Sequence, residues 1–511
     1  MSASLFRESK KNNSHDHWLV MVHSARLATV IVLVGATLSN GCLSGGAASV
    51  QQKPVAQSIV ITNVDDFIAR VSSAPPEIAT DLLIRIAESR LIKDKQRKIN
   101  LLEDAFVRSS DVQKKIRMKR WTGLVDTPSG YLSAAYDLRL DELSLKTRTV
   151  NAMLTLDSER ARTLFSQIPR MEMAPLRCSD VLTYDVSAFY ETAGRVADKS
   201  FTNREKAEGS TVRFIQTYLK DVVSPAEVPS AIEVIVNLRP SISELNLLKP
   251  DIVSALKRVH TDPRSFAVSM TSGGLANNFE RLLGTFRELE IPTQQLMASF
   301  RDYVLAQLST RQCPDMLVGG HNKNMLNKEF VRINQWFAEP ISEDDLKKVE
   351  IGESTNDPSY WSTSESKKFL LRVKELRFNK AGKPVEESET KTLEWQQRMR
   401  QLLNDIGSWN GSGEASEADF FHQKCTLFET LFNLSQTDAT RVEVMLVFAN
   451  YLKSSSIQEQ SRIEWLFHAH SFVKRTQILG VGRVKIMDVF RNSSSQALQL
   501  YSEFDQITSA A

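Results

Sequence analysis

The chain has 511 residues, of which 42% are hydrophobic and 24% are charged, and its formal net charge at pH 7 is +3. This length exceeds what one ordinary hydrophobic core holds, so we expect several domains or one extended repeat array. The composition is that of a folded globular protein. The near balance of charge argues against a nucleic-acid-binding protein, which usually concentrates basic residues on one face.

The first 42 residues have the layout of a bacterial export signal. Basic residues up to Arg26 precede an apolar stretch over residues 27–38. That stretch lies within the roughly 7–15 residues of a signal-peptide core and is shorter than the roughly 20 that span a membrane. The rival interpretation extends the stretch back to Trp18, which would place Arg26 in lipid at a high cost. We therefore predict a signal peptide over residues 1–42.

The end of this segment, residues 39–42 (SNGC), resembles the lipobox of bacterial lipoproteins. Gly41 fits the position before the modified cysteine, whereas the two residues before it fit poorly and Leu38 stands one place too early. The resemblance implies lipid attachment at Cys42 and a protein tethered to a membrane in the periplasm or cell envelope. The rival is cleavage after the small residues 46–48, which would release a soluble exported protein.

Residues 43–62 are rich in Gly, Ala, Ser and Gln, and this composition predicts a flexible tether. From Val64 onward, apolar residues recur at the three- and four-residue spacings of α-helices. Several of these runs begin with Ser or Thr followed three residues later by Glu, a pattern that caps helices. A segment with Cys-Pro and Gly-Gly separates an N-terminal helical-repeat domain, 63–311, from a C-terminal helical domain, 323–511.

The short helices fall into consecutive pairs, which is typical of an α-solenoid. The predicted pairs are 137–154 with 158–168, 227–237 with 244–260, and 441–453 with 457–472. The pattern resembles a degenerate tetratricopeptide or HEAT array, above all over 64–310, although the tetratricopeptide positions are not met at a steady period. We predict an all-α fold of antiparallel helix pairs, in a solenoid or a multi-helix array. Residues 376–386 add either a small β-hairpin or a charged linker.

His422 and Cys425 lie three residues apart on a predicted helix, and Asp419 lies three residues before His422. These are donor types that bind zinc. Phenylalanine and leucine surround them, however, as in a buried helix, and no second ligand cluster stands elsewhere at a recognisable spacing. We therefore expect no metal site here, but a core cysteine beside a surface histidine.

Glu464 and His468 lie four residues apart, a spacing that suits a metal site or acid–base chemistry. His470 follows, but on a helix it points about 200° away from His468, so the two cannot chelate one ion. We expect Glu464 and His468 to form an ordinary surface pair. The sequence therefore predicts no catalytic residue and no metal ligand.

Gly480-Val-Gly482 precedes basic residues and could cradle a phosphate, but it lacks the remaining residues of a dinucleotide fingerprint or a P-loop. A helix-capping turn is the expected structure, and we expect no cofactor. Cys178, Cys313 and Cys425 are far apart in the sequence. In an oxidising compartment one disulfide with one free thiol could form, and the sequence does not select the pair.

These features favour an exported, envelope-associated helical scaffold or adaptor that binds protein partners and no nucleic acid. The alternative is an envelope hydrolase whose residues are dispersed along the sequence, because helical-repeat folds also host enzymes. The chain resembles large exported helical proteins of bacteria. That resemblance is general and implies neither an activity nor particular functional residues.

Overall fold

In the computed structural model, the described residues all belong to one compact unit, Val60–Ala511. The described residues are 64–112, 117–119, 139–171, 173–176, 180–182, 185–271, 274–312, 329–342, 363–379, 382–411, 417–455, 462–480, 482–493 and 495–510. The predicted signal peptide, Cys42 and the tether 43–62 lie outside these residues and stay predictions. None of the described helices is both long enough and apolar enough to span a membrane.

The structure confirms the all-α class and the multi-helix array. Among the described residues the named strands are β1 (Arg117–Lys119) and β2 (Asp180–Leu182), which form a short antiparallel pair. The predicted hairpin at 376–386 is reduced to a single antiparallel bridge between Phe378 and Pro384. The reason is that the preceding helix continues to Arg377 and buries Leu376 in the core, which leaves too few residues for two strands.

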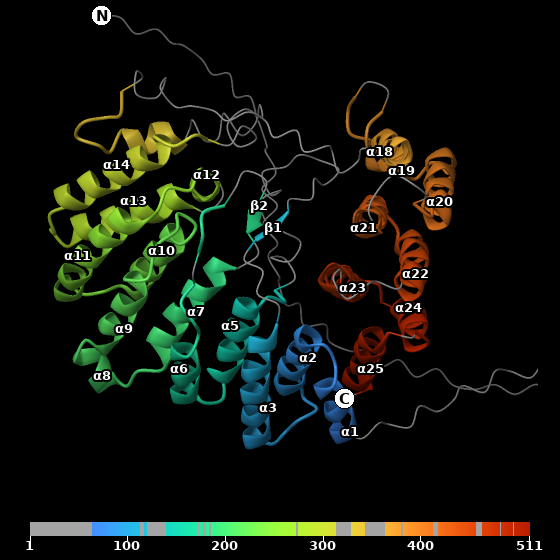
Figure 1. Ribbon diagram of the computed structural model, residues 1–511, viewed down its shortest axis with the longest axis horizontal. Helices are drawn as coiled ribbons and strands as arrows, with labels where there is room; N and C mark the ends of the chain where they lie inside the picture. The colour runs from blue at the N-terminus through green and yellow to red at the C-terminus, as the bar shows by residue number, and fades with distance from the viewer. Residues whose placement is uncertain are drawn as a thin grey trace, which may run out of the picture. The chain divides into compact units, whose positions relative to one another are not determined.

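The N-terminal helices form two layers (Figure 1). Their bounds are α1 (Val64–Ser72), α2 (Pro76–Glu88), α3 (Lys95–Arg108), the 3-10 turn η1 (Ser109–Asp111), α5 (Glu142–Met153), α6 (Ser158–Ser166), α7 (Val186–Lys199), α8 (Asn203–Ala207), α9 (Ser210–Leu219), α10 (Val228–Leu238), α11 (Ile242–Arg258), α12 (Pro263–Thr271), α13 (Leu275–Glu288) and α14 (Gln294–Leu308). In one layer α2, α5, α7, α10 and α13 each pack on the next. In the other layer α9, α11 and α14 do the same.

The C-terminal helices continue this pattern. Their bounds are α18 (Ser364–Arg377), α19 (Glu387–Thr390), α20 (Leu393–Ser408), α21 (Glu417–Leu434), α22 (Asp438–Ser454), α23 (Arg462–Thr476), α24 (Gly482–Arg491) and α25 (Gln496–Ala510). Helices α18, α20, α22 and α24 pack in succession, α21 and α23 both contact α22, and α25 packs on α24.

Two of the three predicted helix pairs are confirmed, because α5 packs on α6 and α22 packs on α23. The third pair differs in its neighbours. Helix α10 makes its main contacts with α7 and α13, whereas α11 makes its main contacts with α9 and α14. The physical reason is that α10 is buried over most of its length, and a helix that is apolar on most sides is held between two neighbours.

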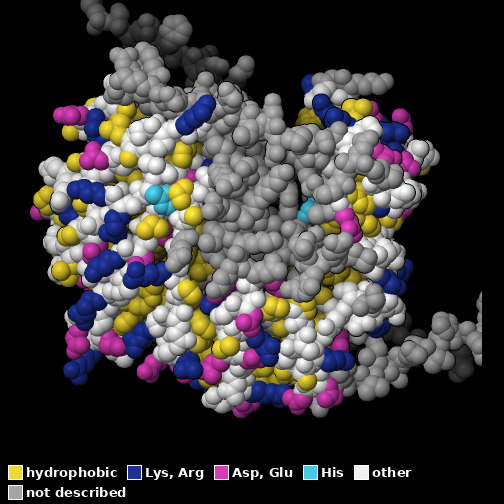
Figure 2. Space-filling view, in the orientation of Figure 1, with side chains coloured by type: hydrophobic (Ala, Val, Ile, Leu, Met, Phe, Trp, Pro, Cys, Tyr) yellow, Lys and Arg dark blue, Asp and Glu magenta, His cyan; other side chains and the backbone are white. Residues whose placement is uncertain are grey.

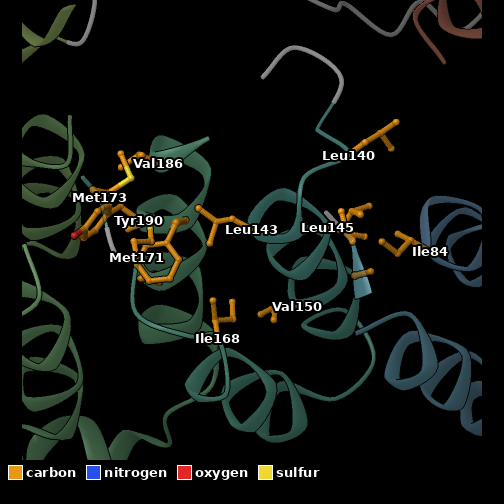
Figure 3. Close-up of a cluster of buried hydrophobic side chains, with 14 of the residues drawn as sticks. Ile84, Leu140, Leu143, Leu145, Val150, Ile168, Met171, Met173, Val186 and Tyr190 are labelled. Atoms are coloured by element: carbon orange, nitrogen blue, oxygen red, sulfur yellow. The ribbon is translucent and has the colours of Figure 1, made fainter. Parts of the chain in front are cut away.

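Helix α5 shows how the layers are held together (Figure 3). It carries Leu143, Leu145 and Val150, all buried, and lies between Ile84 of α2 and Tyr190 of α7. Burying each large aliphatic side chain contributes about 1.5–3 kcal/mol relative to leaving it in water. A helix that buries side chains toward both neighbours therefore stabilises the layer on each side.

The two ends of the described chain meet, because α2 packs on α25. Phe67 of α1 stacks on Phe504 of α25 with ring centroids 6.4 Å apart, and Arg70 forms an ion pair with Glu503. We call the contact of α1 and α2 with α23 and α25 the terminal joint. Through it, the packing order runs from α13 to α2 and then from α25 to α18. The predicted domain division, 63–311 and 323–511, stays a prediction.

Candidate functional site

The structure brings together histidines from the two clusters that the sequence singled out. His422 of α21 and His468 of α23 approach with 2.8 Å between Nδ1 and Nε2, although 46 positions separate them in the sequence. His422 is 2% exposed and His468 is 6% exposed. The prediction that these histidines lie on the surface is therefore wrong. They were misplaced because α21 packs on α20, α22 and α23, which covers the face that carries His422.

The hydrogen bonds define where the protons are. Nδ1 of His468 lies 3.2 Å from Oε1 of Glu429, and a carboxylate only accepts, so His468 donates from Nδ1. With a neutral imidazole at His468, its Nε2 accepts from the Nδ1–H group of His422. Arg475 donates to the other carboxylate oxygen of Glu429 at 3.1 Å. The result is a directed chain from His422 through His468 to Glu429, anchored by a guanidinium.

The charges in this chain follow from burial and from neighbouring groups. Burial, reinforced by His468, holds the pKa of His422 well below its ordinary value, so His422 is neutral at pH 7. Burial favours the neutral form of Glu429, but the hydrogen bond from His468 and the charge of Arg475 outweigh it and lower the pKa of Glu429. The carboxylate orients the imidazole of His468, which in turn orients that of His422, so Nε2 is the basic nitrogen of His422, and burial keeps it a weak base.

Cys425 is a free, fully buried thiol. Burial raises the pKa of Cys425 well above its ordinary value, so it stays a protonated and unreactive thiol at neutral pH. The prediction of a core cysteine is confirmed. The side chains of Asp419 and Glu464, together with Cys178 and Cys313, lie outside the described residues. Among the described residues no group of three or more His, Cys, Asp and Glu side chains has the arrangement of a metal site.

Lys424, which sequence reasoning missed, caps the end of α20. Its Nζ donates to the carbonyl oxygens of Gly407 at 3.0 Å and Trp409 at 2.5 Å, and it lies 4.4 Å from the centroid of the Tyr451 ring. Burial lowers the pKa of Lys424 to about 8. The available signal was a lysine inside the otherwise mostly apolar run of residues 420–428. Its amine binds carbonyl groups that the helix itself cannot pair.

His470 points away from His468, as predicted from the helical spacing. Its Nε2 lies 3.5 Å from Oδ2 of Asp81 on α2, and the ring is 4% exposed. Two histidines that are two positions apart on α23 therefore serve different contacts. His468 joins α23 to α21, and His470 joins α23 to α2.

The turn at Gly480 and Gly482 is the helix-capping turn that the sequence predicted. Gly480 has φ of 50°, and α24 begins at Gly482. A Cβ atom at Gly482 would lie 2.2 Å from Cγ2 of Val442 on α22. Glycine at this position thus permits the close packing of α24 on α22, which accounts for the residue without a phosphate ligand.

Comparison of the chain with models of protein families, with curated proteins and with solved structures gave no match. The functional argument therefore rests on the residues themselves.

Proposed function

We propose that this chain is an exported, envelope-associated helical scaffold that binds a protein partner. The observation that supports the proposal is the extent of the array, because the terminal joint connects the layer from α13 to α2 with the helices from α25 to α18. An array of stacked helix pairs presents a long surface on which a protein partner can be held at several points. Export and attachment to the envelope rest on the predicted signal and on Cys42.

The described surface offers the side chains that such contacts use. Figure 2 shows acidic and basic side chains intermixed over the described helices on this face. Apolar side chains are also exposed, and among them are Leu371 of α18, at 58%, and Leu393 of α20, at 68%. These two helices pack on each other. Protein interfaces combine apolar anchors with a polar rim, so this helix pair is where we would test for a partner.

The test is site-specific photo-crosslinking of the full chain in a host that exports it. A photoreactive amino acid is placed at Leu371 or Leu393, and at Leu247 of α11, which is similarly exposed at 59%, as the matched control. We expect the first two positions to capture the same protein. The purified partner should then bind at least about tenfold more weakly, about 1.4 kcal/mol, to the Leu371→Asp, Leu393→Asp double variant than to Leu247→Asp. The absence of a shared adduct, or equal weakening by the control, would contradict the proposal.

One observation favours the alternative, an envelope hydrolase. The chain from His422 through His468 to Glu429 is of the kind that activates water or a hydroxyl nucleophile. The variant His422→Gln separates the two functions. If the protein hydrolyses ester, peptide or glycan substrates and this variant loses more than about a hundredfold in rate, the hydrolase is supported. Unchanged partner binding in the same variant is the result expected of the scaffold.

A further inference from the structure

The centre of the terminal joint is a buried carboxylate. Asp81 of α2 is fully buried. Its Oδ1 accepts a hydrogen bond from Arg148 of α5 at 2.6 Å, and its Oδ2 lies 3.0 Å from Nε of Arg85. The hydroxyl of Tyr501 on α25 lies 3.4 Å from the same Oδ2. The carboxylate of Asp81 therefore connects α2 to both of its neighbours, α5 and α25.

His470 enters this cluster from α23. Its Nε2 lies 3.0 Å from Nη2 of Arg85, and a guanidinium group only donates, so Nε2 must accept. The imidazole is then neutral, with its proton on Nδ1. Nδ1 is buried and has no hydrogen-bond partner in the described part of the chain. Nε2 also lies 3.5 Å from Oδ2 of Asp81, an acceptor that it can use only if it carries a proton.

The cluster is balanced in charge as long as His470 is neutral. The charged and titratable groups around it are Asp81, Arg85 and Glu88 of α2, Arg148 of α5 and Tyr501 of α25. Asp81 inside the cluster and Glu88 at its exposed edge offset the two guanidinium groups, and burial raises the pKa of Tyr501 so that its hydroxyl stays neutral. A proton on His470 would therefore add one uncompensated charge to a buried site, which is unfavourable.

We propose that the terminal joint opens in acid. Protonation of His470 breaks its hydrogen bond with Arg85 and loosens the contact of α2 with α23 and α25. Once Nε2 carries a proton, it and Nη2 of Arg85 are two donors 3.0 Å apart, and they repel. The protonated Nε2 can donate a hydrogen bond to Asp81, but Asp81 already binds two guanidinium groups. Arg85 must then move, and the packing across the joint moves with it.

The direction of the effect follows from proton linkage. Burial lowers the pKa of His470, the hydrogen bond that a protonated Nε2 makes to Asp81 and the charge of Asp81 both oppose this, and Arg85 and Arg148 lower it further. In an opened joint the solvated histidine takes up a proton near about pH 6.5. Below that pH the opened form binds more protons than the closed form, so the opening equilibrium rises by up to about tenfold per pH unit. Above it, the opening equilibrium is independent of pH as far as His470 is concerned.

The experiment is hydrogen exchange of the full chain, followed by mass spectrometry of peptides from α2 and α25 between about pH 5.5 and pH 7.5. After correction for intrinsic exchange, we expect opening to increase at the lower pH, by up to about tenfold. In His470→Gln the side-chain oxygen still accepts from Arg85 but cannot be protonated, so the increase should vanish. If His470→Gln keeps the slope of the wild type, the proposal is overturned.

Three further measurements keep the test decisive if His470→Gln does not fold. Tyr501→Phe weakens the joint but removes no group that titrates in this pH range. Exchange should therefore be faster at every pH, and its dependence on pH should have the wild-type slope. His422→Gln, at the other histidine contact of α23, should also leave that slope unchanged. Nitrogen-15 NMR of labelled histidine in the full chain should show unprotonated Nε2 at about pH 7.5. A protonated Nε2 at that pH would refute the proposal.

Discussion

Glu227 offers a direct test of how burial controls charge in this array. Its side chain is 1% exposed. Oε1 accepts a hydrogen bond from the hydroxyl of Tyr190 at 3.1 Å, and Oε2 accepts from the backbone N–H groups of Val223 and Ser224, at 2.9 Å each. Burial outweighs these three hydrogen bonds and raises the pKa of Glu227 from 4.5 to about 7. Ionising this carboxyl in the folded state is therefore unfavourable despite its donors.

The magnitude follows from the two pKa values. A folded-state pKa of about 7 against 4.5 in the unfolded chain corresponds to ~3 kcal/mol, at about 1.36 kcal/mol per pH unit. Because the folded pKa is the higher one, this stabilisation is fully present below pH 4.5 and is lost as the pH rises through about 7. Replacing Glu227 by Gln removes the titration, so the local stability of α10 should become nearly independent of pH in this window.

The assay is native-state hydrogen exchange of α10 amides in the wild type and in Glu227→Gln, from about pH 4.5 to pH 8. As the pH rises over this range, the local stability of the variant relative to that of the wild type should increase by ~3 kcal/mol. A constant difference in stability caused by the amide itself does not affect this change. Tyr190→Phe is the informative control, since removing a donor to the carboxylate should raise the pKa of Glu227 and extend the loss of stability to higher pH. A difference between Glu227→Gln and wild type that stays constant with pH would refute the reasoning.

Three other outcomes are expected. Gly482→Ala should destabilise the packing of α24 on α22 by about 1–3 kcal/mol in thermal unfolding, and the second substitution Val442→Ala should restore much of the loss; additive losses would show that the two side chains do not meet. Lys424→Met should cost about 1–3 kcal/mol by leaving buried carbonyl groups unpaired at the end of α20, and exchange of the α20 amides should show it; unaltered exchange would contradict this role. Wild-type protein made in a bacterial host should carry lipid in intact-mass spectra and sediment with membranes, whereas Cys42→Ala should do neither; a soluble wild-type chain that begins near Ser49 would show the lipid prediction to be wrong.

Helix positions could be predicted because they depend on neighbouring residues. Two of the runs with Ser or Thr three residues before Glu, Thr202 with Glu205 and Ser241 with Glu244, form capping boxes at the start of a helix. Each box satisfies backbone N–H groups within three residues, so no distant part of the chain is needed. His468 and His470 lie on opposite faces of α23. This was predictable for the same reason, since it follows from the geometry of one helix.

Contacts between distant helices could not be predicted in this way. The pair of His422 and His468 depends on α21 and α23 packing together, and helical spacing alone does not say which face of α21 is covered. Asp81 and Tyr501 are 420 positions apart. A local signal for the joint did exist, because Asp81 and Arg85 are four residues apart in a helix that is otherwise largely apolar. A charged pair in such a helix requires partners from elsewhere, but the sequence does not identify them.

The joint also explains why α2 can be so thoroughly buried near the start of the folded chain. An end helix of an array normally keeps a polar outer face, yet most of α2, Asp81 included, is buried. The contact with α25 resolves this, because it places α2 inside the array, between α5 and α25. Helix α1, the first described helix, lies at the joint and not at either end of the packing order. The helices from α13 to α2 and those from α25 to α18 therefore meet at the joint. Opening the joint in acid would change how those two sets of helices are held relative to each other, and a partner bound to both would be released.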